Sequence, residues 1–355
     1  MDFLLGGHIR DLSGPILITG HTGFKGTWLT LLLEELGVAC VGLSLREQNG
    51  SLFERLDREG SIPEVFGDIK DYSVVEQTFN TFKPSAVIHL AAQPLVIESY
   101  KNPIETFGTN VMGTANVLDV SVRDSNVKAV IAVTTDKVYK NDELGRKFVE
   151  SDPLYGKDPY SASKVGSEAA ISAWRQISLS NSGPVIVSVR AGNVIGGGDW
   201  SENRLMPDLI KSLTLDQSLE IRSPRSTRPW QHALDPIKGY LMALEAALAQ
   251  TSEMSYNFGP LEDSLSVSEV CEIAVKAWGK SNKIKISDSA TASLPESGSL
   301  DLDSGLAVQN LNWRPVWAQK EAVVATVDWW MSINNGSKSA REACQVDIDK
   351  VLSDA

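Results

Sequence analysis

A short apolar segment, a glycine-rich turn and an apolar helix follow one another directly near the N-terminus. Residues 15–19 read as a buried strand, and residues 28–36 read as a helix that ends at Gly37. Glycine permits a tight turn and close backbone approach, and the N-terminus of a following helix offers free N–H groups to an anion. The order of strand, turn and helix predicts a dinucleotide site, although such turns also occur for packing alone. The turn consists of Gly20, His21, Thr22, Gly23, Phe24, Lys25 and Gly26.

Strands and helices alternate over about the first 190 residues. Further strands are expected at 38–45, 62–66, 86–90, 128–134 and 185–190, and a helix is expected at about 103–123. The alternation predicts an α/β fold with a Rossmann-type doubly wound parallel sheet, and its ligands bind at the carboxyl ends of the strands. The other residues that we expect to contact the dinucleotide there are Arg46, Asp68, Ile69, Leu90, Ala91, Ala92, Gln93, Asn110 and Thr134.

Tyr160 and Lys164 are four residues apart on an expected helix that Asp158 can cap and that Pro159 can begin. A tyrosine that serves as a base at neutral pH needs its pKa lowered by about three units, or about 4 kcal/mol. One positive charge at ~4 Å in an effective dielectric of ~20 supplies roughly that energy. The pair therefore indicates a phenolate that can oxidise a carbinol, while the alternative is a chance pair on a solvated helix.

Composition limits the class of protein and its partners. A chain of 355 residues with 42% hydrophobic content can form one large or two modest domains. The net charge of −12 argues against nucleic acid as a partner. Three scattered cysteines form neither a disulfide framework nor a metal site, which fits the cytoplasm. The apolar run near the N-terminus is too short to span a membrane.

The strand pattern stops after Gly192, which suggests a second domain. We expect an N-terminal arm at 1–14, a dinucleotide-binding domain mainly at 15–192 and a tail at 334–355. The region 193–333 is expected to be mostly a smaller mixed α/β substrate domain, from which one segment can return to the sheet.

Basic and aromatic residues cluster between Arg222 and His232, together with Arg225, Arg228 and Trp230. Arginine offers planar paired donors to a diphosphate and tryptophan offers a flat apolar surface, so the cluster suits a nucleotide-diphosphate ligand. The alternative is a solvated basic loop. The residues that we expect to contact a substrate are Gln93, Asn193, Arg204, Arg222, Arg228 and His232.

Several of these segments together resemble the extended short-chain dehydrogenase/reductase superfamily, and within it the branch of CDP-glucose 4,6-dehydratases. The resemblance extends from about Gly14 to Trp330. It is carried by the glycine turn, by Ala-Gln-Pro-Leu-Val at 92–96, by Thr-Thr-Asp-Lys-Val-Tyr at 134–139, by the segment 190–200 and by Thr-Arg-Pro-Trp-Gln-His at 227–232.

The resemblance implies a lyase reaction that expels water from a nucleotide hexose. Tyr160, aided by Thr135, would take the proton of the 4-hydroxyl while hydride leaves carbon-4. Asp136 is the candidate acid for the 6-hydroxyl and Lys137 the candidate base at carbon-5, a role that needs a lowered lysine pKa. Alternatively, Asp136 and Lys137 form a solvated charge pair.

The implied cofactor is NAD, tightly bound and restored in each turnover, and the implied substrate of first choice is CDP-glucose. NADP is not excluded, because Ser44-Leu45-Arg46 offers no acidic residue for the adenosine ribose. Relatives dimerise through helices that correspond to about 103–123 and 158–180, which implies a homodimer or a dimer of dimers.

The chain departs from the usual family pattern at two places. Ile97 stands where an arginine is usual, and residues 295–298 lack a His-Glu-Ala-like segment. Two alternatives to dehydration remain: a nucleotide-sugar 4-epimerase and a non-catalytic dinucleotide-binding regulator.

Overall fold

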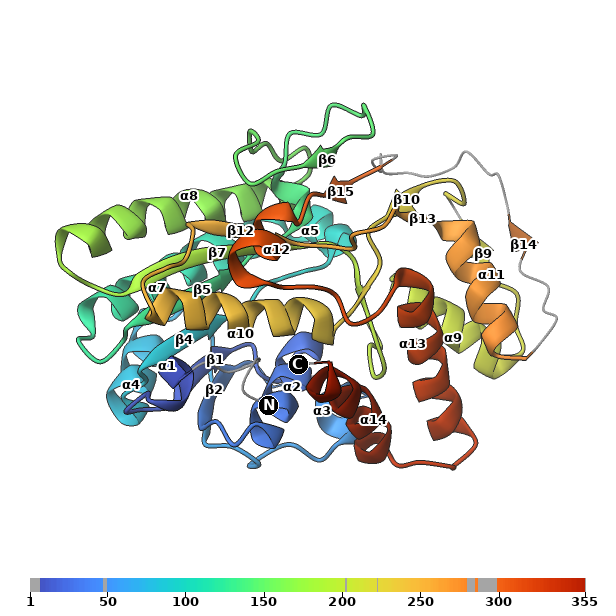
Figure 1. The fold of residues 1–355 in the computed structure, drawn as a ribbon, viewed down its shortest axis with the longest axis horizontal. Coiled ribbons are helices and arrows are strands. Elements are labelled where there is room, and N and C mark those ends of the chain that lie inside the picture. The colour runs from blue at the N-terminus through green and yellow to red at the C-terminus, as the bar shows by residue number, and fades with distance from the viewer. Residues whose placement is uncertain are drawn as a thin grey trace.

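The computed structural model describes residues 7–46, 50–201, 203–221, 223–279, 285–286 and 299–354, and its centre is a seven-stranded sheet (Figure 1). The strands lie in the order β12-β7-β5-β4-β1-β2-β3, and all of their pairings are parallel. Their bounds are β1 Ile16–Thr19, β2 Cys40–Ser44, β3 Glu64–Phe66, β4 Ala86–His89, β5 Ala129–Val133, β7 Val185–Ala191 and β12 Ser255–Phe258.

The strand order confirms the doubly wound sheet predicted from the sequence. The chain runs from β1 outward through β2 and β3, then returns to the other side of β1 with β4. The reversal creates a switch point between β1 and β4, where the loops that follow the two strands diverge. The segment expected to return to the sheet is β12, which pairs with β7 at the opposite edge from β3.

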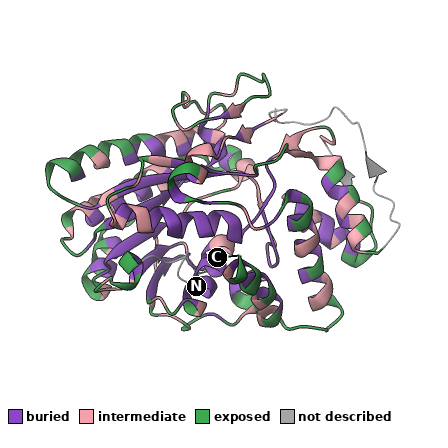
Figure 2. Cartoon of the chain, viewed as in Figure 1, coloured by how far each residue is buried: buried purple, intermediate pink, exposed green. Residues whose placement is uncertain are grey.

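Helices cover both faces of the sheet because neighbouring residues of a strand point to opposite sides. Ile16 and Ile18 pack with α2 (Phe24–Glu35) and α10 (Leu234–Leu248), whereas Leu17 packs on the other face. That second face is covered by α4 (Tyr72–Phe82), α7 (Thr114–Arg123) and α8 (Pro159–Ser180). The helix α10 is buried along almost its whole length (Figure 2), because helices also cover its outer side.

The expected helix over 103–123 is interrupted in the structure. It comprises α6 (Pro103–Phe107), a π-helical turn η1 (Gly108–Gly113) and α7. Within that turn the amide of Asn110 is fully buried, and its Nδ2 donates to Ser163 Oγ (2.8 Å) and to the carbonyl of Gln93 (3.1 Å). Asn110 thereby joins the segment after β4 to α8.

Both ends of the described chain pack more closely than the sequence suggested. Residues 7–10 form α1 (Gly7–Arg10), where Ile9 is buried and the N–H groups of His8 and Ile9 donate to the Glu245 carboxylate. The expected N-terminal arm is thus anchored to the rest of the protein from residue 7 onward. The tail forms α14 (Ala340–Ser353), and it is not peripheral because Cys344 and Ile348 lie in the core with α2 and α10.

The smaller part of the molecule lies on the right in Figure 1 and contains α9 (Leu205–Leu215), α11 (Val267–Ala277) and α13 (Gln319–Asn334). Short strand pairs accompany these helices, including β10 (Thr227–Arg228) with β13 (Leu265–Ser266) and β8 (Val194–Ile195) with β11 (Gln231–His232). Above the sheet, β6 (Lys147–Phe148) pairs with β15 (Asp301–Leu302). The division into domains at about residue 193 stays a prediction.

Candidate active site

The glycine turn has the backbone geometry that a close approach to pyrophosphate requires. Gly20 has φ of +75°, and a Cβ there would lie 2.8 Å from the backbone nitrogen of Ala91. A Cβ on Gly26 would lie 2.1 Å from the Gly20 carbonyl oxygen. Phe24 begins α2, whose first N–H groups face the turn. The cradle between the loops after β1 and β4 therefore has the close backbone approach that a dinucleotide site requires.

Two side chains of the turn, those of His21 and Thr22, form hydrogen bonds with other residues of the protein. His21 is fully buried and its Nε2 lies 2.6 Å from Glu64 Oε2, so this side chain fills the space above Gly42 rather than facing a ligand. Burial lowers the pKa of His21, although its hydrogen bond with Glu64 raises it. Thr22 Oγ1 lies 2.8 Å from Ser44 Oγ and ties the turn to the end of β2.

Lys25 extends from the turn toward the catalytic residues. Its Nζ donates to the hydroxyl of Tyr240 on α10 at 3.3 Å, a contact for which the sequence offers no signal. Burial of the ammonium lowers the pKa of Lys25 to about 7, and the charges of Lys164 and Arg204 add to the shift. A positive group that is easily neutralised thus lies beside the predicted Tyr160–Lys164 pair.

The helix of the redox pair begins as the sequence predicts. Asp158 is the N-cap of α8, its carboxylate accepts the N–H of Ser161 (2.9 Å), and Pro159 occupies the first turn. Both Tyr160 and Lys164 are buried on the face toward the sheet. The cap therefore fixes the rotation of α8 that turns this pair inward.

The electrostatics of the pair differ from the expectation. Lys164 Nζ donates to the carbonyl of Val133 at 3.1 Å, and burial lowers the pKa of Lys164 to about 8. Burial raises the pKa of Tyr160 to about 12, against a lowering by its hydrogen bond with Thr135. The loss of hydration outweighs the lowering of the Tyr160 pKa by Thr135 and by the charge of Arg204.

Asp136 and Lys137 lie on the short 3₁₀ turn η2 (Asp136–Val138) directly after β5. Asp136 is fully buried, and its Oδ1 accepts from Thr135 Oγ1 (2.8 Å) and from Lys137 Nζ (3.3 Å). Its Oδ2 has no hydrogen-bond partner within the described residues. Lys137 Nζ also lies 3.5 Å from Asn193 Oδ1, and the charge of Asp136 acts on both Tyr160 and Lys25. The structure thus brings together the predicted acid, base and redox pair.

Residues 16–259 match the model of the NAD dependent epimerase/dehydratase family. The chain belongs to this family. CDP-glucose 4,6-dehydratase of Salmonella typhimurium is 40% identical, and the match covers 88% of this chain and 89% of that protein. The human dTDP-D-glucose 4,6-dehydratase is 26% identical, with 93% of each chain covered.

Solved structures of similar proteins agree on the fold. UDP-glucose 4-epimerase from Thermotoga maritima, solved with UDP-glucose, superposes with a TM-score of 0.78 at 20% identity, covering 90% of this chain and 99% of that one. A dTDP-glucose 4,6-dehydratase from Streptomyces venezuelae, solved with NAD, gives 0.76 at 23% identity, with 91% and 98% covered. Dehydratases and epimerases therefore share this architecture.

In this epimerase/dehydratase, several residues predicted to bind the cofactor hold the backbone of the site. The Gln93 side chain donates to Thr106 Oγ1 (2.9 Å) and accepts the N–H of Leu95 (2.6 Å), so it is committed to the turn before α5 (Val96–Lys101). Ile69 is buried in the core. Leu90, Ala91 and Ala92 are half-buried after β4, and Arg46 and Asp68 remain partly exposed after β2 and β3.

Of the predicted substrate contacts, Asn193 and Arg204 lie near the catalytic residues. The charge of Arg204 acts on Tyr160 and on Lys25, and its Nη1 pairs with Asp199 at 3.4 Å. Arg228 lies on β10, where its Nη1 donates to the carbonyl of Thr227. Arg222 lies outside the described residues, as does the segment 295–298.

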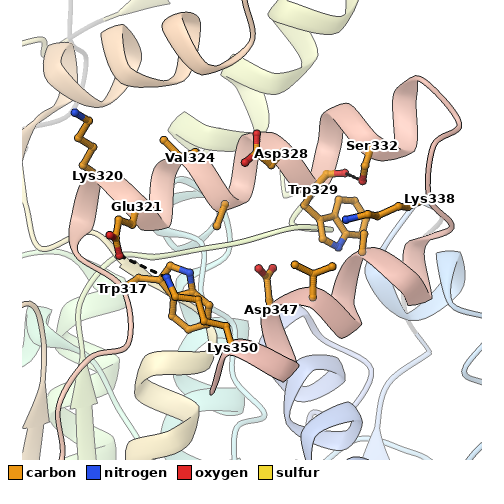
Figure 3. A pocket seen from close by; sticks show the side chains of 13 residues that line it. Trp317, Lys320, Glu321, Val324, Asp328, Trp329, Ser332, Lys338, Asp347 and Lys350 are labelled. Atoms are coloured by element: carbon orange, nitrogen blue, oxygen red, sulfur yellow. Dashed lines mark hydrogen bonds and ion pairs between the residues drawn. The ribbon is translucent and has the colours of Figure 1, made fainter. Parts of the chain in front are cut away.

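The expectation for His232 was wrong. This side chain is fully buried, stacks on Trp317 with ring centroids 4.2 Å apart, and its Nε2 lies 3.4 Å from Asp347 Oδ2 on α14. Trp317 and Asp347 also line a groove of about 590 Å³ between α13 and α14, with Asp328 and Lys350 along its walls (Figure 3). His232 therefore joins the C-terminal helix to the core instead of meeting a substrate.

Two further findings concern metals and membranes. Among the described residues, no group of three or more His, Cys, Asp or Glu side chains is arranged to hold a metal ion. None of the described helices has the length and apolar character needed to cross a bilayer.

Proposed function

We propose that this protein is a nucleotide-sugar 4,6-dehydratase, with CDP-glucose as its first-choice substrate and CDP-4-dehydro-6-deoxyglucose and water as products. The observation that carries the proposal is the acid–base pair beside the redox tyrosine. Asp136 and Lys137 are in contact at 3.3 Å, and Asp136 acts electrostatically on Tyr160. The 40% identity to a CDP-glucose 4,6-dehydratase over 88% of the chain supports the choice of nucleotide.

The cofactor is NAD, which when bound supplies the hydride acceptor for carbon-4 and the hydride donor for carbon-6. The residues that would hold it are the backbone of the glycine turn, Ala91, Lys164 and Tyr160. Lys164 uses one of its three N–H bonds on Val133, which leaves two for hydroxyl groups of the ligand. Arg46 stacks on Phe66 and pairs with Glu59, so it faces the end of β2 where the adenosine half would lie.

The residues perform four proton movements in turn. Tyr160, as the phenolate, takes the proton of the 4-hydroxyl and becomes the neutral phenol, and its hydrogen bond with Thr135 favours the phenolate beforehand. Lys137, in its neutral form, takes the proton on carbon-5, which the neighbouring 4-ketone has made acidic. Asp136, in its protonated form, delivers a proton to the departing 6-hydroxyl, so that the carbon–oxygen bond breaks and water leaves. The Lys137 ammonium then returns its proton to carbon-5 as carbon-6 is reduced. The unpartnered Oδ2 of Asp136 suits contact with a substrate oxygen.

A 4-epimerase is the second candidate because the same fold carries that reaction in solved relatives. Epimerisation has no water to eliminate, so it gives no role to an acid and a base after Thr135. A non-catalytic regulator would have no need for a buried Tyr160–Lys164 pair.

Product mass separates these candidates. The purified protein with NAD is incubated with CDP-, UDP-, dTDP- and GDP-glucose, and each nucleotide sugar is followed by mass spectrometry. Loss of one water from CDP-glucose supports the proposal. Unchanged mass with inverted stereochemistry at carbon-4 supports an epimerase, and no conversion of any substrate supports a regulator.

We further propose a homodimer that acts in the cytoplasm. Large apolar side chains project from α6 and η1, where Ile104 is 85% and Met112 58% exposed. Tyr100 and Phe107 extend the same exposed apolar segment. Water contact with so much apolar surface is unfavourable, and a second copy would remove it. Ile104→Asp with Met112→Asp should convert the dimer to a monomer in sedimentation measurements, whereas a wild-type monomer would refute the proposal.

A further inference from the structure

One buried ion pair lies beneath the turn that carries Asp136 and Lys137. Glu168 on α8 and Arg190 on β7 are each less than a tenth exposed. They contact through two hydrogen bonds, from Arg190 Nε to Glu168 Oε1 (2.7 Å) and from Nη2 to Oε2 (3.0 Å). Paired bonds of this kind fix direction as well as distance. Glu168 lies one helical turn after Lys164, so the ion pair also belongs to the helix of the redox pair.

The same two residues hold both ends of the η2 turn. Before the turn, the Thr134 hydroxyl donates to Glu168 Oε1 at 2.6 Å. After the turn, Arg190 Nη1 donates to the Tyr139 hydroxyl at 2.8 Å. The hydrogen bonds therefore form a closed ring that runs from Thr134 through Glu168 and Arg190 to Tyr139, with the Asp136–Val138 segment as its remaining side.

Tyr139 is anchored from other directions as well. Its hydroxyl donates to Asn257 Oδ1 on β12 (2.7 Å), and its ring stacks on Phe148 with centroids 5.2 Å apart and planes 8° from parallel. The side chain is 2% exposed. A tyrosine held at its hydroxyl and on its ring face has little conformational freedom. The turn that precedes it is restricted in the same way.

We infer that Glu168, Arg190 and Tyr139 are positioning residues for water elimination, which fix Asp136 and Lys137 relative to the Tyr160–Lys164 pair. The inference rests on the proposed dehydratase function. Oxidation at carbon-4 depends on residues of α8 and on Thr135, whereas elimination depends on the turn that the ring holds. Loosening the ring at Tyr139 should therefore slow elimination more than oxidation.

Tyr139→Phe tests this inference, since it removes one hydroxyl and leaves the ion pair and the ring stacking in place. Tyr256→Phe is the matched control: it removes a buried hydroxyl on the same strand as Asn257, one that accepts the N–H of Glu253 at 2.9 Å and takes no part in the ring of hydrogen bonds. Thr134→Val releases the other end of the turn. The measurements are amide hydrogen exchange of the wild type and variants without substrate, and turnover of CDP-glucose carrying deuterium at carbon-5.

Tyr139→Phe and Thr134→Val should speed exchange at the amides of residues 137–139, and Tyr256→Phe should not. In Tyr139→Phe, elimination should fall by about 10- to 100-fold with a larger carbon-5 isotope effect, while formation of the reduced cofactor changes by less than about twofold. Equal slowing of both steps, or unchanged exchange at 137–139, would overturn the inference. If the wild type dehydrates no nucleotide sugar, the proposed function fails, and the exchange data still report whether the ring holds the turn.

Discussion

Lys137 Nζ lies 3.3 Å from Asp136 Oδ1, while the other oxygen of this fully buried carboxylate has no hydrogen-bond partner among the described residues. A buried carboxylate oxygen without a partner is costly, so its retention at this position calls for an explanation. Contact with a substrate hydroxyl supplies one. The two oxygens of Asp136 therefore have different roles: Oδ1 accepts from Lys137, and Oδ2 is left for the substrate.

Lys137→Ala should therefore lower dehydration of CDP-glucose by about 10²- to 10⁴-fold, the range for loss of a general base. Oxidation at carbon-4 should persist, because Tyr160 and Thr135 are unchanged, and a reduced cofactor should accumulate under single-turnover conditions. Stopped-flow absorbance and product mass measure the two steps. Lys140→Ala is the control, as this exposed lysine lies just beyond the same turn. Normal dehydration by Lys137→Ala would show that another group is the base.

Gly26→Ala should weaken both the fold and the binding of NAD. The new Cβ would lie 2.1 Å from the Gly20 carbonyl oxygen and 2.7 Å from His21 Cα, and both are backbone atoms that cannot rotate away. Overpacking of this kind costs about 1–3 kcal/mol. Thermal unfolding and fluorescence titration with NAD measure the two effects.

Gly23→Ala serves as its control because the nearest atom to that Cβ is 3.4 Å away and φ is −68°. This variant should unfold at the wild-type temperature. Equal destabilisation by the two alanines would mean that the turn relaxes to accept a side chain at residue 26.

The sequence was sufficient for the sheet and for the position of Asp136 and Lys137 after β5, because both depend on local order. Apolar runs between glycines give the strands, and a parallel sheet brings their carboxyl ends together wherever the helices lie. The direction of a side chain cannot be obtained in this way. His21 and His232 were expected to meet ligands, but His21 turns toward Glu64 and His232 toward Asp347, each partner lying far away in the sequence. Tyr240 was missed for the same reason.

Asp347→Ala should destabilise the fold without affecting substrate binding. It would remove the carboxylate that faces the buried His232 Nε2 at 3.4 Å, and the loss of a buried polar contact costs about 1–3 kcal/mol. Chemical denaturation should show the loss, while KM for the nucleotide sugar stays within about twofold of the wild type. Asp349→Ala, on the exposed face of the same helix, should change neither quantity. A large rise in KM for Asp347→Ala would instead restore His232 to the substrate site.

Asp235 should make the stability of the protein fall as the pH rises. This carboxyl group is fully buried on α10, its Oδ1 accepts the N–H of Val316 at 2.6 Å, and its Oδ2 has no partner among the described residues. Burial raises the pKa of Asp235 to about 7, which the charges of His232 and Lys238 only partly offset. The folded state therefore keeps a proton that the unfolded chain releases above about pH 4.

The stabilisation from that proton is complete below about pH 4 and is lost as the pH rises through about 7. Asp235→Asn keeps the acceptor for Val316 and removes the ionisation, so at about pH 8 it should be more stable than the wild type by about 1–3 kcal/mol. The difference should shrink toward about pH 4, and urea unfolding at several pH values measures it. Asp263→Asn, at an exposed position, should leave the pH profile unchanged. If the stability of Asp235→Asn changed with pH in parallel with that of the wild type, the pKa of Asp235 would lie near its ordinary value.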